Sequence, residues 1–347
     1  MSPASAEQTG VVVRPFRDED ESAVLGLLQA SLGGGPTGKR TPEFFRWKHR
    51  ENVFGASLML VAEVDGEIVG LRAFMRWAFA ADGRRLSAVR AVDTATHPDH
   101  QGKGIFSRLT LEALDMLRDE GVDFVFNTPN GKSLPGYLKM GWKPVGRFPV
   151  RIRVRHPWRF GRGARGALSG AETATSLHDV SGAEPAGSLL STQDSLGDLL
   201  RSRVAPAGRL ATPVDVDYLR WRYAEAPELA YRAVVDEDAA GVRGFAVFRT
   251  RSRGTLREAT VAELMVRAGD EAAIGRLLAR VGRASGADHL ALSPPAGSAE
   301  ARSLVRHGAF TAPRGMTLVV NPLRGGITPS PEVLSSWSLG LGDVEVF

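Results

Sequence analysis

The feature that most constrains the fold is an internal repeat, in which four segments of the first half return in the same order in the second half. The pairs are residues 41–49 with 212–223, 60–74 with 231–248, 124–133 with 289–298, and 140–142 with 307–310. A repeat unit of well over about a hundred residues indicates two copies of one domain rather than a solenoid of short units. The length of 347 residues fits this reading, because single hydrophobic cores rarely grow beyond about 250–300 residues.

The first copy predicts alternating strands and helices. The expected strands are 11–15, 58–64, 68–74, 86–96 and 124–126, and the expected helices are 18–32, 105–120 and 134–140. Asp65-Gly66 between two apolar runs is a strong signal for a tight hairpin. This order predicts a mixed α/β layer rather than a doubly wound parallel sheet.

The repeat and the composition divide the chain into four parts. The first copy is expected at 11–150 and the second at 192–325, with a linker rich in Gly, Ala and Ser at 151–191 and a C-terminal tail at 326–347. Trp47 and Trp221 fall at equivalent places in the two copies. We therefore expect both indoles to serve core or interdomain packing rather than ligand binding.

Composition excludes several classes of function. The net charge of +5, from 44 basic and 39 acidic residues, is too small to indicate a nucleic-acid partner, although it suits an anionic cofactor. The chain has no cysteine, which rules out disulfides, thiolate nucleophiles and cysteine zinc sites. His97 and His100 lack a third ligand nearby, so no metal is expected. No apolar run reaches the roughly 18 residues of a membrane span, and the polar N-terminus lacks a signal peptide, so we expect a cytoplasmic protein without a membrane partner.

One loop carries the clearest chemical signal. A strand that ends at Thr96 is followed by Gly102, Lys103 and Gly104, and a helix then begins at Ile105. Glycine lets backbone N–H groups approach a ligand without an obstructing Cβ, and the start of a helix attracts anions. The spacing is neither that of the nucleotide P-loop nor that of the dinucleotide fingerprint. The loop is thus a candidate pyrophosphate site of another kind.

At these residues the sequence resembles the GCN5-related N-acetyltransferase (GNAT) superfamily. Gln101-x-x-Gly104-x-x is similar to the Gln/Arg-x-x-Gly-x-Gly/Ala motif of that family, with Phe106 standing where Gly or Ala is usual. Asn130 followed by Tyr137-Leu138-Lys139-Met140-Gly141-Trp142 resembles the family's Asn…Tyr-x-x-x-Gly-Phe ending. The resemblance is strong over residues 11–150 and weak over 192–323, and it implies two GNAT-like domains in tandem.

The resemblance implies an N-acyltransferase that uses acetyl-CoA as co-substrate. The pantetheine arm is then expected along the backbone of Thr94, Ala95 and Thr96. The pyrophosphate is expected on the loop and helix start formed by Gln101, Gly102, Lys103, Gly104, Ile105 and Phe106. Asn130 either contacts the pantetheine or caps the short helix that follows it.

Two residues are candidates for the chemistry. Tyr137 falls at the family's position for the general acid that protonates the CoA thiolate, although a packed core aromatic is the alternative. Asp93 is a carboxylate in an otherwise apolar strand, where it is out of place unless it is functional or paired. It is therefore either the general base or the partner of Arg90 or another cation. The second copy has Glu263 at the matching position.

The second copy is expected to have lost its cofactor site. It lacks the paired glycines, places Asp270 and Glu271 where phosphate would lie, and has Leu304 at the tyrosine position. Repulsion between these carboxylates and phosphate predicts that this copy does not bind CoA. Its expected work is to complete a substrate pocket or to stabilise the pair. Tandem relatives also suggest that the carboxylate of Phe347 docks near Tyr137.

Three functions agree with these observations. The first is transfer of an acetyl group from acetyl-CoA to a primary amine, carried by a small molecule or, as the second choice, by a protein lysine. The alternative is a non-catalytic acyl-CoA-binding or scaffold protein of the same fold. A third reading keeps the fold and changes the donor to a longer acyl group or an aminoacyl carrier. No motif identifies the acceptor or the oligomeric state.

Overall fold

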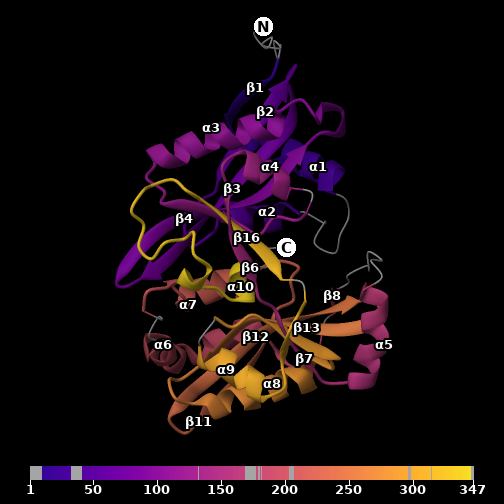
Figure 1. The fold of residues 1–347 in the computed structure, drawn as a ribbon, viewed down its shortest axis with the longest axis vertical. Helices are drawn as coiled ribbons and strands as arrows, with labels where there is room; N and C mark the ends of the chain where they lie inside the picture. Colours follow the sequence, from indigo (N-terminus) through magenta and orange to yellow (C-terminus); the bar gives the residue numbers. More distant parts are fainter. Residues whose placement is uncertain are drawn as a thin grey trace.

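The computed structural model describes residues 10–32, 41–131, 133–168, 177–178, 180, 182–202, 207–295, 298–313 and 315–344. These residues form two β-sheets with helices packed against them, which lie one above the other in Figure 1. The mixed α/β architecture expected from the sequence is confirmed.

The upper sheet has nine strands in the described part of the chain, and its main path runs β1-β2-β3-β4-β5-β16-β6. Its strands are β1 (Val12–Pro15), β2 (Leu58–Val64), β3 (Glu67–Ala81), β4 (Arg84–Thr96), β5 (Phe124–Asn127), β16 (Met316–Pro322), β6 (Lys143–Phe148), β10 (Leu210–Ala211) and β17 (Trp337–Ser338). The predicted hairpin is present, since Asp65 and Gly66 between β2 and β3 both have positive φ, at 51° and 84°.

The lower sheet has eight strands among the described residues, and its main path runs β9-β11-β12-β13-β14-β7-β15. Its strands are β9 (Glu184–Pro185), β11 (Arg232–Asp238), β12 (Gly241–Arg253), β13 (Leu256–Val266), β14 (His289–Leu292), β7 (Arg151–Val154), β15 (Phe310–Thr311) and β8 (Leu177–His178). Each strand of this path has a counterpart at the same place in the upper sheet, as the sequence repeat requires.

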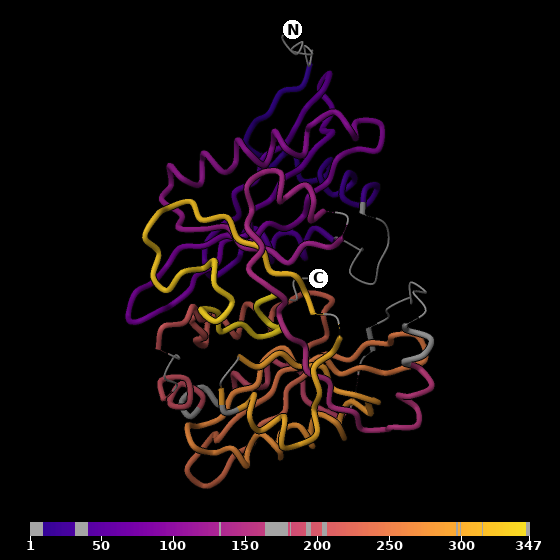
Figure 2. Tube along the Cα trace, in the orientation of Figure 1, coloured from indigo at the N-terminus to yellow at the C-terminus, as the bar shows by residue number. Residues whose placement is uncertain are grey.

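The two sheets exchange one strand. β7 follows β6 in the chain but lies between β14 and β15 of the lower sheet. β16 follows β15 in the chain but lies between β5 and β6 of the upper sheet. Figure 2 shows both crossings, with the magenta chain descending into the orange unit and the yellow chain rising into the purple one. Residues 151–154, which were expected in the linker, therefore belong to the lower sheet. Residues 316–322, which were expected in the second copy, belong to the upper sheet.

The helices are short except for one in each copy. They are α1 (Glu21–Leu32), α2 (Pro42–His49), α3 (Ile105–Asp119), α4 (Leu134–Lys139), α5 (Pro157–Leu168), α6 (Gln193–Ser202), α7 (Val216–Leu219), α8 (Glu271–Ser285), α9 (Ala299–Arg306) and α10 (Leu341–Val344). Segments of 3-10 helix are η1 (Asp18–Asp20), η2 (Pro98–His100), η3 (Ala186–Thr192) and η5 (Leu334–Ser336), while η4 (Arg220–Ala224) is a π-helix. Part of the predicted linker is thus helical.

The long helices α3 and α8 cross their sheets at a repeated glycine. A Cβ on Gly70 of β3 would lie 2.7 Å from Ile105 Cγ2, and one on Gly244 of β12 would lie 3.2 Å from Leu277 Cδ1. Real side chains do not approach so closely at Gly70, so the first helix could not pack in this position over any larger residue. The close crossing explains why a glycine opens this strand in both copies.

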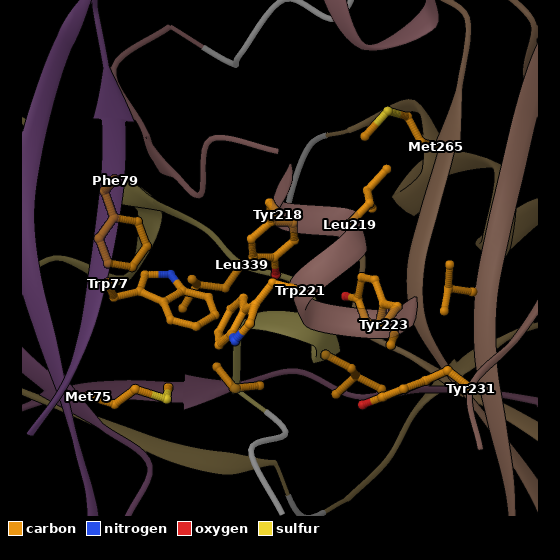
Figure 3. Packing of buried hydrophobic residues seen from close by; sticks show 14 of the residues in the cluster. Met75, Trp77, Phe79, Tyr218, Leu219, Trp221, Tyr223, Tyr231, Met265 and Leu339 are labelled. Carbon is orange, nitrogen blue, oxygen red and sulfur yellow. The ribbon is translucent and has the colours of Figure 1, made fainter. Parts of the chain in front are cut away.

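A single hydrophobic cluster joins the two sheets. It contains Trp77 and Phe79 from β3, Tyr218 and Trp221 from the second copy's helical segment, and Met265 from β13, as Figure 3 shows. The rings of Trp47 and Trp221 stack with their centroids 5.5 Å apart, and both side chains are almost fully buried. The interdomain packing expected for the two repeated tryptophans is confirmed.

The described part of the C-terminal tail ends in the buried helix α10, which two arginines hold. Arg90 of β4 donates to the carbonyls of Asp343, at 2.6 Å, and Val344. Arg222 of η4 donates from Nε and Nη2 to the carbonyl of Gly342, at 3.2 and 3.0 Å. Burial, and then the nearby charge of Arg222, lower the pKa of Arg90 to about 9, which leaves it charged at neutral pH. Phe347, whose carboxylate was expected near Tyr137, lies outside the described residues.

Candidate functional site

The site begins where two parallel strands of the upper sheet separate. β4 pairs with β5 only from Ala88 to Arg90, although β4 continues to Thr96. On its other side β4 keeps pairing with β3, but the register shifts at Asp93, the extra residue of a β-bulge with a φ of 38°. A bulge bends its strand and increases the local twist. The bend leaves the β5 side of residues 91–96 facing a cleft rather than another strand.

The cleft is a cavity of about 670 Å³. Most of the residues predicted for the site line it, and they are Asp93, Thr94, Ala95, Thr96, Gln101, Gly102, Gly104, Ile105, Phe106, Asn130 and Tyr137. Among the predicted residues that the structure describes, Lys103 is the exception, and it lies exposed on the loop. The structure thus brings together three segments that are separate in the sequence: the end of β4, the glycine loop and the turn into α4.

The glycine loop has the geometry of an anion site. Gly102 and Gly104 both have a φ of 77°, a left-handed conformation that side chains disfavour. Gly104 is the N-cap of α3, and no side chain caps that helix. The free N–H groups and the dipole of a helix of 15 residues therefore point toward the cavity that Gly104 and Ile105 line. This arrangement suits a phosphate group.

Tyr137 is both packed in the core and part of the cavity wall. Its side chain is only 4% exposed, and its ring meets Phe106 and Trp142 nearly edge-on at 5.8 and 5.2 Å. Arg72 Nη1 donates a hydrogen bond of 2.9 Å to Tyr137 Oη. Because the guanidinium occupies a lone pair of that oxygen, the phenol hydrogen is left to donate elsewhere. Phe106, the departure from the family motif, packs directly against this tyrosine.

Asp93 is paired with two side chains of α2. Its Oδ2 lies 2.7 Å from Lys48 Nζ and 2.9 Å from His49 Nε2. The side chain of Asp93 is 4% exposed, and those of Lys48 and His49 are 2% and 0% exposed. His49 Nδ1 in turn lies 2.9 Å from Ser57 Oγ. The sequence left two hypotheses for Asp93, a general base or the partner of a cation. The structure shows the ion pair of the second hypothesis, and the cation is Lys48 rather than Arg90.

The second copy repeats this contact. Trp47, Lys48 and His49 correspond to Trp221, Arg222 and Tyr223, and Tyr223 Oη donates to Glu263 Oε2 at 2.9 Å. A carboxylate of the bulged strand is thus tied to the preceding helical segment in both copies. Since the second copy lacks the paired glycines of the loop, the recurrence favours a role for Asp93 in the architecture of the domain.

Asn130 lies at the rim of the cavity and also caps the turn before α4. Its Oδ1 accepts from the Ser133 backbone N–H at 2.9 Å and from Ser133 Oγ at 3.1 Å. Its carbonyl accepts from Leu134 N at 3.0 Å. Asn130 therefore closes the turn that precedes α4, whereas the N-cap of α4 itself is Ser133, and its place at the rim remains compatible with a contact to pantetheine.

Sequence reasoning did not single out Arg72, Lys48 or His49. A signal for Arg72 was present, because it is a charged residue in the apolar run Val69–Phe74 of β3. Such a residue is rare in a buried strand unless it has a partner. For Lys48 and His49, the repeat around Trp47 and Trp221 marked the segment but gave no indication of a contact with Asp93.

The equivalent cleft of the second copy is smaller and acidic. A cavity of about 250 Å³ there is lined by Glu263, Glu300 and Asp343, and no basic side chain lines it among the described residues. Asp270 caps α8 by accepting from Ala273 N at 3.1 Å. Burial alone would raise the pKa of Asp270, but hydrogen bonds from Arg243 and the Ala273 amide outweigh it and lower the pKa. The anion position of this helix is therefore filled by its own carboxylate.

Two wider properties concern the described chain as a whole. No group of three or more His, Asp or Glu side chains within it is arranged to hold a metal ion. None of its helices has the length and apolar character to cross a bilayer.

Known proteins share this architecture. Residues 12–145 match the family model described as an acetyltransferase (GNAT) domain. A probable N-acyltransferase from Enterococcus faecalis V583 gives a TM-score of 0.60 at 14% identity, over 91% of this chain and 73% of that one. A GCN5-related N-acetyltransferase from Kribbella flavida gives 0.54 at 19%, over 90% and 71%. Eis1 from Mycobacterium abscessus gives 0.53 at 17%, over 90% and 73%. No curated protein is significantly similar in sequence.

Proposed function

Through residues 12–145 this chain belongs to the GNAT superfamily, and we propose that it transfers an acetyl group from acetyl-CoA to a primary amine. The observation that carries the proposal is the convergence of three predicted segments on one cavity. The end of β4 would hold the pantetheine arm, the start of α3 the pyrophosphate, and Tyr137 the sulfur. All three are needed at once for a thioester to be bound and its thiolate protonated.

Tyr137 is the proposed general acid. A phenol is protonated at neutral pH, as a proton donor must be. Its oxygen lines the cavity wall and already accepts from Arg72, which leaves its own hydrogen for the departing sulfur. A protonated leaving group prevents the thiolate from attacking the new amide.

The proposal assigns Asp93 to the support of the site rather than to proton transfer. Its bonds from Lys48 and His49 favour the charged carboxylate, and a carboxylate stabilised in this way is a weak base. The competing assignment, in which Asp93 takes the proton of the amine, predicts that substitution of Asp93 lowers kcat more than it lowers stability.

The acceptor is proposed to be a small amine, with a protein lysine as the second choice. The cavity must hold both an acyl-pantetheine arm and the acceptor, and its volume of about 670 Å³ falls within the range of small-molecule sites. A longer acyl group would use more of this volume. Comparing acetyl-CoA with longer acyl-CoA donors at a fixed amine concentration distinguishes the two kinds of donor.

Two measurements test the proposal. Calorimetry with CoA should give one site per chain, and at a hundredfold excess over Kd bound CoA should stabilise the protein by about 2.7 kcal/mol. A mass-spectrometric screen of an amine library with acetyl-CoA should then reveal an acetylated product. Tight CoA binding without any product would replace this proposal by the alternative of a non-catalytic acyl-CoA-binding protein.

A further inference from the structure

Arg72 is a buried cation without an acidic partner. It lies on β3 with none of its surface exposed, and no Asp or Glu of the described chain is within ion-pair distance of it. Its Nε and Nη2 are also without hydrogen-bond partners there. Burying an unpaired charge is costly, so the presence of Arg72 at this position calls for a functional explanation.

The contacts of Arg72 point to the cavity. Its Nη1 donates to Tyr137 Oη at 2.9 Å and also to Thr94 Oγ1, and both of these residues line the cavity. The guanidinium lies over three aromatic rings, with its carbon 4.5 Å from the centroid of Phe74, 5.3 Å from that of Tyr137 and 5.6 Å from that of Phe106. The face of an aromatic ring attracts a cation through the ring quadrupole, but the ring carries no net charge and so stabilises the guanidinium less than a carboxylate would.

The second copy shows that the fold does not require this arginine. Arg72 pairs with Thr94 two residues after Gly70, and Ala246 pairs with Leu264 two residues after Gly244. Arg72 therefore corresponds to Ala246, just as Tyr137 corresponds to Leu304. Ala246 and Leu304 are both fully buried. The copy without a glycine loop thus has apolar residues at both positions, whereas the copy with the loop has the arginine and the tyrosine together.

We propose that Arg72 is a positioning residue for Tyr137, which holds the phenol oxygen and compensates the negative charge that forms on it during acyl transfer. This inference rests on the proposed function. The amine nitrogen bonds to the thioester carbon, the C–S bond breaks, and its electron pair passes to sulfur. Sulfur takes the proton of Tyr137, which leaves a phenolate 2.9 Å from the Arg72 guanidinium. The proton lost by the amine nitrogen goes to solvent, and solvent returns a proton to the phenolate.

This charge balance explains why the guanidinium lacks a carboxylate partner. A permanent carboxylate beside Arg72 would neutralise it before the reaction and would repel the phenolate. A preorganised charge aimed at the place where negative charge develops costs no rearrangement at the moment of reaction. Thr94, Phe74 and Phe106 meanwhile fix the orientation of the guanidinium in the resting protein.

A double-mutant cycle tests the inference, with kcat for CoA release from acetyl-CoA and a reactive amine as the measured quantity. Arg72→Met should lower kcat by about 10²-fold, the lower end of what loss of one preorganised donor costs. Arg72→Lys, which keeps a charge, should recover part of that loss. In a Tyr137→Phe background, Arg72→Met should change kcat by less than about threefold, because residues that act as a unit are not additive.

Arg249→Met is the matched control, because Arg249 is also buried, at 3% exposure, in the sheet of the second copy. It should lower the melting temperature while kcat at a permissive temperature stays normal. Equal losses from Arg72→Met with and without the Tyr137 hydroxyl would overturn the inference alone. If Arg72→Met does not fold, the same cycle with Arg72→Lys decides, since additive losses there overturn the inference equally. A wild-type protein that binds CoA but acetylates no amine overturns the proposed function and this inference with it.

Discussion

Trp47 and Trp221 hold each other by reciprocal hydrogen bonds. Trp47 Nε1 donates to the carbonyl of Trp221 at 2.6 Å, and Trp221 Nε1 donates to the carbonyl of Trp47 at 2.9 Å. Equivalent residues that exchange equivalent bonds relate the two copies by an approximate twofold axis, as in an isologous dimer. Together with the exchange of β7 and β16, this contact leads us to expect that the two copies unfold as one cooperative unit rather than as independent domains.

Residues 1–150 alone should therefore fail to form a stable domain. They lack β16, whose Leu318, Val319 and Val320 are completely buried between β5 and β6. Without that strand two sheet edges stand open, and open edges favour aggregation. We expect the isolated segment to be aggregated or to unfold without cooperativity, as measured by circular dichroism during heating.

The control for this experiment restores the missing strand. A version of residues 1–150 with residues 313–324 fused through a flexible linker should regain solubility and a cooperative transition. Cooperative unfolding of residues 1–150 by themselves, at a temperature near that of the full chain, would show that the strand exchange is not needed for folding.

Two matched glycine variants test the phosphate loop. Gly102 and Gly269 lie in equivalent loops, have positive φ of 77° and 83°, and would each give a Cβ open space. Gly102→Glu and Gly269→Glu should therefore cost similar stability, about 1–2 kcal/mol for the left-handed backbone. Only Gly102→Glu should abolish CoA binding in calorimetry, because it alone places a carboxylate at the proposed phosphate site. Equal CoA affinity in both variants would exclude that site.

Asp93→Asn should destabilise the protein more than it slows acyl transfer. The change leaves Lys48 buried and charged without its carboxylate, and breaking a buried pair costs about 3–5 kcal/mol. We expect a large fall in melting temperature and a kcat within about tenfold of the wild type at a permissive temperature. A loss of about 10²–10⁴-fold in kcat with a normal melting temperature would instead identify Asp93 as the general base.

The repeat predicted the two-sheet fold, but not the path of the chain through it. β7 and β16 are short strands with the same pattern in either sheet, and periodicity does not say which sheet a strand joins. Their positions depend on the order imposed by the facing copies. The predicted boundary between the first copy and the linker, at residue 150, depends on local composition. Local composition carries no information about an exchange of strands between sheets.

The candidate site, like the fold, could be predicted from the sequence only in part. The glycine loop and the tyrosine motif are local in the sequence, and the residues they marked line the cavity, except for Lys103. Arg72 contacts Tyr137, which lies 65 positions further along the chain. Lys48 contacts Asp93, which lies 45 positions further along. No spacing rule joins residues so far apart. Only the folded sheet and the close approach of α2 bring these side chains together.

Removal of α10 should destabilise the whole chain. A protein that ends after Gly340 loses the carbonyls of Gly342, Asp343 and Val344, which accept from Arg90 and Arg222. Hydrogen bonds to charged groups contribute about 1.5–3 kcal/mol each, so the three lost carbonyls should together lower the free energy of unfolding by roughly 4.5–9 kcal/mol, measured with urea. A chain that ends after Val344 keeps these acceptors and should unfold like the full chain. Equal stability of both truncated forms would contradict this role of the two arginines.

Tyr137→Phe separates acid catalysis from core packing. The variant keeps the ring between Phe106 and Trp142 and removes only the hydroxyl that Arg72 contacts. Loss of the proton donor should lower kcat by about 10²–10⁴-fold. The free energy of unfolding should fall by about 1.5–3 kcal/mol, the scale of one hydrogen bond to a charged group, and CoA affinity should stay close to that of the wild type. Packing alone predicts the reverse, with normal turnover and any loss following stability. Measuring kcat, CoA affinity and melting temperature on one preparation decides between them, and full activity would assign the proton donor to another group or to solvent.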